Sequence, residues 1–232
     1  MEKDTIVDNF ISKYSLEKRD KEFIEKIIKP IINHVEFKKR FSFLHHGNIT
    51  LGEHIIEDAV LTYKLSKKKN IRQDLAVKIA MFHDLYTVPW QNNKDARVNK
   101  FFHKHGFRHP VEAIINSINW YPEYFNDEND SKIIIDGILH HMFPLPVMRL
   151  NENNISNSEL KNVDLYFKIP YKHKLMILDS LNRKKIGPVS LGRSKYLEGR
   201  IMSKADRIVS RGQIKNFSTA KSLLTGHNKK IK

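Results

Sequence analysis

The sequence predicts an all-α protein, and three observations lead to this fold class. Apolar residues make up 40% of the 232-residue chain, which is enough to build a core. Glycine and proline are scarce, at 9 and 8 residues, which disfavours a sandwich or barrel with many turns. Apolar residues recur at helical spacing, and no segment strongly favours a strand. We expect one helical domain over residues 1–214 and a basic tail over 215–232.

The first helices are expected within residues 4–36, where apolar side chains repeat at helical spacing. Pro30 kinks or divides this region, because proline lacks the N–H that a helix interior needs. Thr50 and Glu53 match a capping box, in which two side chains satisfy backbone N–H groups at a helix start. The pattern predicts a helix from there to about Lys68.

Residues 74–84 form the most apolar helix that the sequence predicts, and we expect it to be central and buried. Residues 85–108 are interpreted as a loop, because they mix Asn, Lys and aromatic residues without an apolar period. His109 and Pro110 indicate the next helix start, since proline is favoured at the first helical position. A further helix is expected over residues 131–142.

The last predicted helix covers residues 194–211 and carries Asp206 at the edge of its apolar face. Residues 146–193 separate it from the preceding histidines and are interpreted as an insertion. Within that insertion, 151–163 is rich in Asn and Ser and predicts a surface loop. The segment 173–184 predicts a short helix.

The composition excludes several kinds of site and favours anionic partners. The chain has no cysteine, which rules out disulfides, thiolate zinc sites, iron–sulfur clusters and a cysteine nucleophile. The 41 Lys and Arg residues exceed the 26 Asp and Glu residues by 15, which favours phosphates, nucleotides or nucleic acid as partners. The N-terminus lacks a signal-peptide pattern, and no apolar run is long enough to span a membrane. We therefore expect a cytoplasmic protein without a membrane partner.

Histidine is the residue type that most clearly indicates a functional site in this sequence. His83 and Asp84 directly follow the most apolar helix, where polar groups are costly unless they are paired or bind a metal. An imidazole and a carboxylate together suit a divalent cation. The other candidate ligands lie at or near predicted helix ends or edges, which a bundle can bring to one interior site: His54, His109, His140, His141 and Asp206. Taken singly, each also has an ordinary explanation as a first-turn, loop or salt-bridge residue.

The order of these residues resembles the H…HD…D signature of the HD superfamily of metal-dependent phosphohydrolases. The matching residues are His54, the pair His83-Asp84 and the distant Asp206. The resemblance covers roughly residues 45–150 and 194–211. It implies an HD-domain helical bundle, here with extra N-terminal helices and an insertion before the last motif helix.

Extra histidines make the chain similar to HD branches that bind two metals, such as the HD-GYP cyclic-dinucleotide phosphodiesterases and the HD-type symmetrical dinucleoside-tetraphosphate hydrolases. The resemblance implies a first metal held by His54, His83, Asp84 and Asp206. It implies a second metal, bridged by Asp84, with these ligands: His109 and His141, or less favourably His140. One or two divalent ions are expected, of Fe, Mn, Mg, Zn, Co or Ni. The chain also resembles a set of uncharacterised bacterial HD-domain proteins, which names no substrate.

The chain departs from the family pattern in three ways. Residues 86–90 stand where a glycine-lysine commonly follows the HD pair. The GYP triplet is absent, which counts against cyclic di-GMP as the substrate. The long segment 146–193 is either a substrate-specificity insertion or a decorated loop.

The resemblance implies hydrolysis of a phosphate ester or anhydride, with a nucleotide or dinucleotide as the expected substrate. A hydroxide activated by the divalent ions would attack phosphorus, and Asp84 belongs to that catalytic centre. Asp58 lies one helical turn after His54 and is a candidate general base, a partner that orients a ligand, or a plain surface carboxylate. Candidate phosphate-binding side chains lie near the proposed ligands in sequence, with an ordinary solvated surface as the alternative for each: Lys104, Arg108 and Arg149.

A different class of function is a nucleic-acid-binding protein, or an HD-type nuclease that uses a basic surface. Basic runs at residues 67–69 and 229–230 favour it, and two solvated runs are the simpler explanation. A degenerate HD protein with a structural metal or none is a third alternative. The arrangement of the candidate ligands distinguishes the enzyme from the nucleic-acid-binding protein. A metal-dependent enzyme needs these side chains to meet at one site, whereas a binding protein does not. Histidines in the polar loops, such as His45 and His105, are interpreted first as ordinary loop residues rather than metal ligands. Near the site, their alternative role would be to bind phosphate or transfer a proton.

Overall fold

The helical prediction is confirmed by the computed structural model, which describes residues 3–88, 105–150 and 162–224. Its α-helices are α1 (Lys3–Lys13), α2 (Lys18–Asn33), α3 (Val35–Lys38), α4 (Leu51–Ser66), α5 (Gln73–Phe82), α6 (His105–Trp120), α7 (Glu128–Leu139), α8 (Val163–Lys168), α9 (Tyr171–Asn182) and α10 (Leu197–Leu224). Short 3₁₀ helices and strands complete these described ranges: η1 (Lys39–Ser42), η4 (Pro122–Phe125), β1 (Leu44–His46), β2 (Ile49–Thr50), β3 (Val147–Met148), β4 (Lys185–Ile186) and β5 (Val189–Ser190). None of the described helices combines the length and the apolarity that a membrane span requires.

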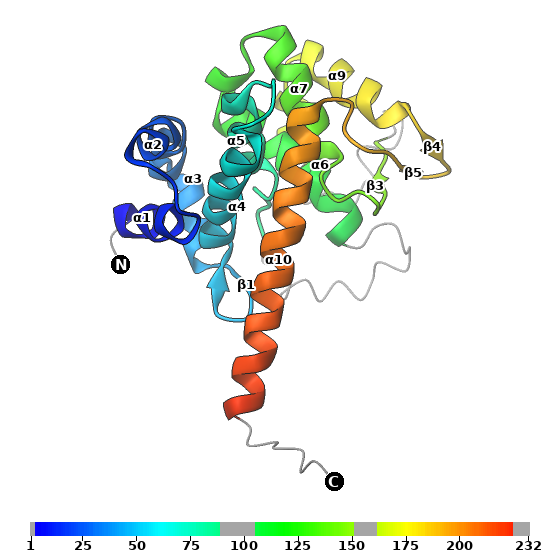
Figure 1. Cartoon of the computed structure of the whole chain (residues 1–232). Helices are drawn as coiled ribbons and strands as arrows, with labels where there is room; N and C mark the ends of the chain where they lie inside the picture. The colour runs from blue at the N-terminus through cyan, green and yellow to red at the C-terminus, as the bar shows by residue number, and fades with distance from the viewer. Residues whose placement is uncertain (1–2, 89–104, 151–161, 225–232) are drawn as a thin grey trace.

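Helices α4, α5 and α10 form the centre of the bundle (Figure 1). α4 packs against both of the others, and α5 also contacts α2 and α7. Helices α1 and α2 cover one flank of α4, whereas α8 and α9 lie on the opposite side of the molecule, against α6 and α7. The main cluster of buried apolar side chains includes residues from every one of these layers. The centre is therefore enclosed on both sides.

Helix α4 starts where the capping box predicts. The backbone N–H of Glu53 donates to Thr50 Oγ1 at 3.2 Å, and the backbone N–H of Thr50 donates to Glu53 Oε2 at 2.8 Å. The cap fixes the first residue of the helix, so that His54 and Asp58 lie one turn apart on the same face. Both side chains are fully buried, because this face packs on α5 and α10.

Helix α5 is buried along nearly its whole length and ends at Phe82. The backbone N–H of His83 still donates to the carbonyl of Ile79 at 3.0 Å, so His83 completes the last turn. His83 and Asp84 thus lie at the end of an apolar helix and deep in the interior, as the sequence predicts.

Helix α6 begins at His105, four residues before the predicted start at His109. The prediction placed Pro110 at the first helical position, but this proline lies inside the helix. A proline crowds the carbonyl of the residue four positions earlier and cannot donate to it. That residue is Gly106, where an added Cβ would meet nothing within 4 Å, so the first turn has room to adapt. Part of the segment interpreted as a loop is therefore helical.

Helix α7 begins three residues before its predicted start and ends three residues before its predicted end. The Asp127 carboxylate caps it by accepting the backbone N–H of Asp130 at 2.8 Å. The helix ends at Leu139, so that His140 and His141 lie in the turn that follows.

Residues 146–193 contain more regular structure than the sequence predicts. β3, β5 and β4 form an antiparallel sheet in that order, and α8 and α9 pack on α6 and α7. Each of these strands has two residues, which is too short for an alternating pattern to be visible in the sequence. Most of the predicted surface loop at 151–163 lies outside the described residues.

Helix α10 continues to Leu224, past the predicted end at residue 211 and into the segment interpreted as a tail. Its first part packs against α4, α5 and α7, and its C-terminal end projects beyond the rest of the molecule (Figure 1). At Gly199 the helix approaches α7 closely, because a Cβ there would lie 2.7 Å from Gly137 Cα. Asp206 lies two turns further on and faces the ends of α5 and α7.

Candidate metal centre

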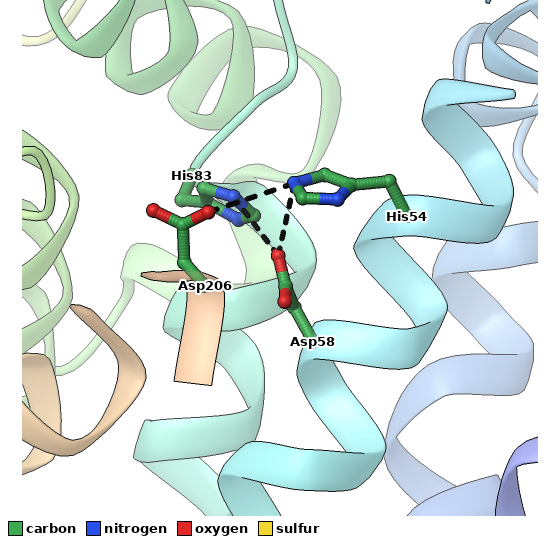
Figure 2. A group of neighbouring side chains, drawn as sticks. All are labelled: His54, Asp58, His83 and Asp206. Atoms are coloured by element: carbon green, nitrogen blue, oxygen red, sulfur yellow. Dashed lines mark ion pairs between the residues drawn. The ribbon is translucent and has the colours of Figure 1, made fainter. Parts of the chain in front are cut away.

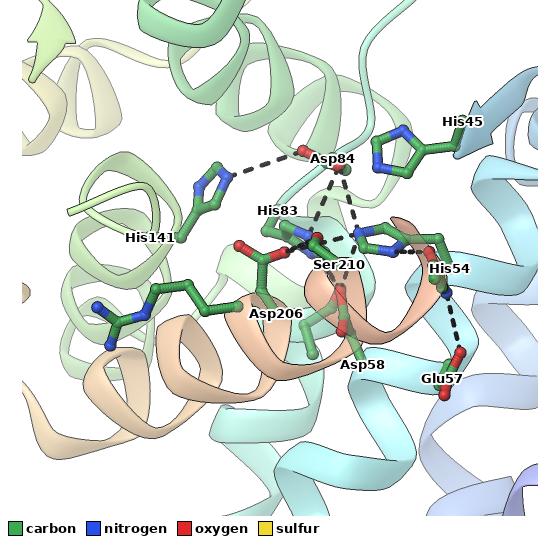
Figure 3. A network of polar contacts seen from close by, with 12 residues as sticks. His45, His54, Glu57, Asp58, His83, Asp84, His141, Asp206 and Ser210 are labelled. Atoms are coloured by element: carbon green, nitrogen blue, oxygen red, sulfur yellow. Dashed lines mark hydrogen bonds and ion pairs between the residues drawn. The ribbon is translucent and has the colours of Figure 1, made fainter. Parts of the chain in front are cut away.

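A group of histidines and aspartates from five segments of the chain meets in the interior of the bundle (Figure 3). Each residue of the group is at most 8% exposed. We call this group the His/Asp cluster, and its members are His54 and Asp58 of α4, His83 and Asp84 after α5, His109 of α6, His141 after α7, and Asp206 of α10. The structure thus brings together all the residues of the H…HD…D pattern.

One half of the cluster lies between α4, α5 and α10 (Figure 2). Asp58 Oδ2 lies 3.1 Å from His54 Nε2 and 3.4 Å from His83 Nε2. Asp206 Oδ1 lies 3.7 Å from His54 Nε2. These four residues offer one ligand atom each within 4.8 Å of one another, so they could hold a single metal ion.

Asp84 lies between this half of the cluster and the other histidines. Its Oδ2 is 3.8 Å from His54 Nε2 and 3.7 Å from His83 Nε2. Its Oδ1 is 3.2 Å from His109 Nε2 and 3.8 Å from His141 Nε2. One carboxylate oxygen therefore faces each pair of rings, which is the arrangement that a bridging ligand requires.

Hydrogen bonds on the far side of the rings fix which nitrogen carries the proton. A carbonyl oxygen only accepts, so a ring nitrogen bonded to it must donate. In three rings Nδ1 donates to a backbone carbonyl of the preceding turn: His83 to Ala80 at 2.7 Å, His109 to His105 at 3.0 Å, and His141 to Ile138 at 2.7 Å. Each neutral ring then has a lone pair on Nε2, and that atom faces the cluster.

The fourth ring, His54, is oriented by a side chain. Gln213 Nε2 donates to Glu57 Oε2 at 2.9 Å, which turns the amide oxygen of Gln213 toward His54. His54 Nδ1 lies 3.1 Å from that oxygen and donates to it. Glu57 in turn accepts from the Tyr14 hydroxyl at 2.8 Å and pairs with Lys13. Residues of α1, α4 and α10 therefore hold the tautomer that leaves His54 Nε2 as an acceptor.

The contact between His109 and His141 favours a cation between the two rings. Their Nε2 atoms are 3.0 Å apart. Because both Nδ1 atoms are donors, two neutral rings would point their lone pairs at each other. A shared proton or a metal ion removes this repulsion.

Three buried carboxylates also crowd the cluster with negative charge. Burial and the neighbouring charges of Asp206, Asp84 and Glu57 raise the pKa of Asp58 well above its usual range. Burial, together with Asp84, raises the pKa of Asp206 against the opposing effect of His83. Burial also favours a higher pKa for Asp84, but His83 and the other nearby rings outweigh it and hold that pKa well below its usual range. A divalent cation would offset the repulsion among these carboxylates.

The donor set fits a divalent transition metal. Imidazole nitrogens together with carboxylate oxygens are ligands that Mn, Fe and Zn accept. Within the described ranges, neither Asp58 oxygen nor His83 Nε2 has a hydrogen-bond partner, although both residues are 0% exposed. Burial, together with His109 and His83, lowers the pKa of His141 well below its usual range, so this ring is kept in the neutral form that binds metals.

A cavity of about 380 Å³ gives access to the cluster. Asp84, His109, His141 and Asp206 line it on the cluster side, and residues 142–145 form an apolar wall. The other lining residues are His45, His105, Gly106, Arg207 and Ser210. A small molecule in this cavity would therefore contact the candidate ligands directly.

His140 belongs to a different network, although the sequence offered it as an alternative ligand. Its Nε2 lies 3.2 Å from Ser180 Oγ and 3.8 Å from Asp136 Oδ1. Asp136 also accepts from Ser194 Oγ at 2.7 Å and pairs with Arg183. Adjacent residues near a helix end point in different directions, about 100° apart in a regular helix, so only His141 faces the cluster.

The basic residues that the sequence suggested for phosphate binding do not line the cavity in the described part of the chain. Arg108 is buried, and its Nε pairs with Glu112 Oε1 at 2.9 Å. Arg149 lies near the small sheet, where its Nη2 donates to Asn182 Oδ1 at 2.8 Å. Lys104 lies outside the described residues.

Sequence reasoning missed the positions of several site residues on α4 and α10. Asp58 was proposed as a base or an orienting partner, but its carboxylate lies among the ligand atoms themselves. Ser210 donates to Asp206 Oδ1 at 3.1 Å, and Gln213 orients His54. Helical spacing was the available signal, because positions four and seven residues after Asp206 share its face.

His45 lies closer to the cluster than a polar loop residue is expected to. The β1–β2 hairpin, which turns at Gly47, places the His45 ring 4.3 Å from the His54 ring, measured between centroids. His45 Nδ1 is 3.1 Å from the Tyr86 hydroxyl. Ligand atoms of His45, His54 and Asp84 also lie within 4.8 Å of one another. The hairpin therefore contributes directly to the site.

Comparisons with known proteins do not identify this chain. No family model, curated protein or solved structure matches it. The geometry alone establishes a buried group of His and Asp side chains that could hold a metal ion, in a helical fold compatible with the HD type.

Proposed function

We propose that the protein is a divalent-metal-dependent phosphohydrolase that cleaves a phosphate ester or anhydride of a nucleotide. One observation carries the proposal. Four imidazoles with fixed tautomers direct Nε2 toward three buried carboxylates beside a cavity. A purely structural cluster has no need for acceptor nitrogens that face each other at 3.0 Å. The chain order of these residues, which resembles the HD signature, supports the same reaction class.

Two ligand sets are available, and the Asp84 carboxylate lies between them. The first set consists of His54, Asp58, His83 and Asp206. The second consists of His109 and His141, with Asp84 Oδ1 beside both rings. When bound, divalent cations stabilise charge on phosphoryl oxygens and lower the pKa of a coordinated water.

The other side chains of the cavity suit a nucleotide. A phosphate bound by the candidate ligands would lie in the cavity, and the apolar wall at 142–145 offers packing surface for a base. Arg207 lines the same cavity and brings a positive charge to the phosphate. A phosphorylated molecule with an apolar, planar part would match both the charged side of the cavity and its apolar wall.

The test measures metal content by elemental mass spectrometry, in protein purified without an affinity tag or chelator, together with hydrolysis of a nucleotide panel. We expect about two equivalents of a transition metal. His83→Ala and Asp84→Ala should lose metal and activity while circular dichroism shows retained helicity. His173→Gln is the matched control, because His173 is also buried but donates to the Phe125 carbonyl at 2.9 Å, outside the cluster.

Two results would contradict the proposal. Full activity in either cluster variant would exclude these residues from the reaction. Absence of metal, even after incubation with Mn or Fe, would exclude a metal centre.

A further inference from the structure

The solvent face of α10 carries a row of basic side chains. We call this row the basic stripe, and it consists of Arg200, Lys204, Arg207 and Arg211, all of them exposed. At about 100° per residue, the four positions fall within an arc of about 60° on the helix and span about 16 Å along its axis. The stripe is therefore one continuous line of positive charge.

Within the described ranges, no carboxylate pairs with any residue of the stripe. The acidic residues of α10 itself, Glu198 and Asp206, are both buried. Arg207 is held by backbone carbonyls instead, since its Nε donates to Ser203 at 3.1 Å and its Nη1 to Phe143 at 3.4 Å. These bonds orient the guanidinium without neutralising its charge, which stays available to an external anion.

The stripe passes the cavity that leads to the His/Asp cluster. Arg207, in the middle of the stripe, lines this cavity together with Asp206 and Ser210. Ile208 and Ile214 are 46% and 52% exposed and flank the stripe on the same helix. Positive charge and exposed apolar surface therefore both continue outward from the site.

We propose that the basic stripe binds the phosphates of a single-stranded nucleic acid and that Arg207 directs one phosphate into the cavity. The inference rests on the proposed function, and it identifies a polynucleotide as the substrate of the proposed hydrolysis. Cations about one helical turn apart along a line suit the regularly spaced phosphates of one extended strand. A single strand is favoured over a duplex because a cavity of about 380 Å³ accepts one nucleotide and not a base pair.

The test measures binding of fluorescein-labelled oligouridylate and oligothymidylate, each about 12 nucleotides long. Fluorescence anisotropy is recorded at several salt concentrations, in EDTA, so that binding is observed without hydrolysis. Lys204→Gln/Arg211→Gln removes two stripe charges that do not line the cavity. Lys68→Gln/Lys69→Gln is the matched control, because it removes two exposed charges after the end of α4.

We expect the stripe variant to bind roughly tenfold more weakly at low salt, and its slope of log affinity against log salt to be shallower by about 1.4. The control variant should change affinity less than about twofold, because its lysines are not part of the basic stripe. Equal losses in the two variants would overturn the inference, as would failure of the unmodified protein to bind either oligonucleotide.

Other outcomes separate this inference from its alternatives. Binding to phosphatidylserine vesicles, with no binding to either oligonucleotide, would overturn it in favour of a membrane surface. Because the readout is binding in EDTA, it does not depend on the metal centre. A protein that binds the strand through the stripe but never contains metal would support the strand-binding surface and contradict the proposed hydrolysis.

Discussion

At the scale of single residues, the candidate site depends on the Nδ1 protons of the cluster histidines. Backbone carbonyls hold this proton in three rings, and Gln213 holds it in His54. A ring whose tautomer and orientation are already fixed binds a cation without first rotating or losing a proton. The partners of Nδ1 therefore influence metal affinity alongside the ligands themselves.

Gln213→Met should weaken metal binding about 10–100-fold while the protein remains folded. Methionine has a similar length but leaves His54 Nδ1 without its acceptor, so the tautomer is no longer fixed. Calorimetric titration of Mn into metal-free protein measures the change. Gln73→Met is the control, since among the described residues the Gln73 amide bonds only to the Ser66 carbonyl, at 3.4 Å. Unchanged affinity in Gln213→Met would show that the orientation of His54 has no influence.

The sequence predicted which residue types would meet but not how each side chain points. Candidate ligands at helix ends follow from the apolar pattern, because a bundle directs such positions inward. The choice between His140 and His141 depends on the direction of the turn after α7, which no periodicity reveals. The place of Asp58 among the ligand atoms depends on which neighbours pack on α4, which the sequence of one helix does not contain.

At the scale of elements, the position of Asp206 depends on how closely α10 approaches α7. Gly199 and Gly137 make this approach possible, because neither has a side chain at the contact. A Cβ on Gly199 would lie 2.5 Å from Ser194 Oγ, which itself donates to Asp136. The glycine pair thus sets the distance between the helices that carry the two sides of the site.

Gly199→Ala should destabilise the protein by about 1–3 kcal/mol, because the added methyl group overpacks the contact with α7. Gly212→Ala, on the same helix, should stabilise it by about 0.5–1 kcal/mol, since alanine is the better helix former. An added Cβ on Gly212 meets nothing within 4 Å. Urea denaturation measures both changes. A Gly199→Ala protein as stable as the parent would contradict the tight approach.

The element boundaries that the sequence misplaced have identifiable causes. Pro110 suggested a helix start because proline is favoured there, yet α6 accommodates it one turn further in. The end of α10 was placed too early because the basic residues after 211 have no strong apolar period. Extending a helix that has already formed adds one hydrogen bond for each residue, so α10 can continue without an apolar period on a segment that leaves the core.

At the scale of the whole molecule, the cluster connects segments that are far apart in the chain. Its members come from α4, α6 and α10 and from the ends of α5 and α7. A cation bound by these residues would tie the helices of the bundle to one another. Folding stability and metal occupancy are then coupled, because the binding free energy adds to the stability of the folded state.

Removal of metal should lower the melting temperature of the protein. A ligand at about 100 times its Kd adds about 2.7 kcal/mol, which for a domain of this size corresponds to roughly 5–10 °C. Differential scanning fluorimetry with and without EDTA measures the shift. Asp84→Ala is the control, because a variant that has already lost its metal should show no further change. An equal EDTA effect in parent and variant would mean that the chelator acts elsewhere.

The sequence predicted the fold class better than it predicted the finer features of the structure. Apolar spacing, the capping box at α4 and the scarcity of turn residues were sufficient for an all-α bundle, because these features act locally. The small sheet of β3, β5 and β4 could not be predicted, since its strands are held by contacts between distant segments and are too short to leave a pattern.

The proline inside α6 also affects the backbone that borders the cavity. Pro110 has no N–H to give to the carbonyl of Gly106, and Gly106 lines the cavity. The regular helical hydrogen bond between these two residues is therefore missing. The part of α6 beside the cavity is thus held by one backbone hydrogen bond fewer than a regular helix of the same length.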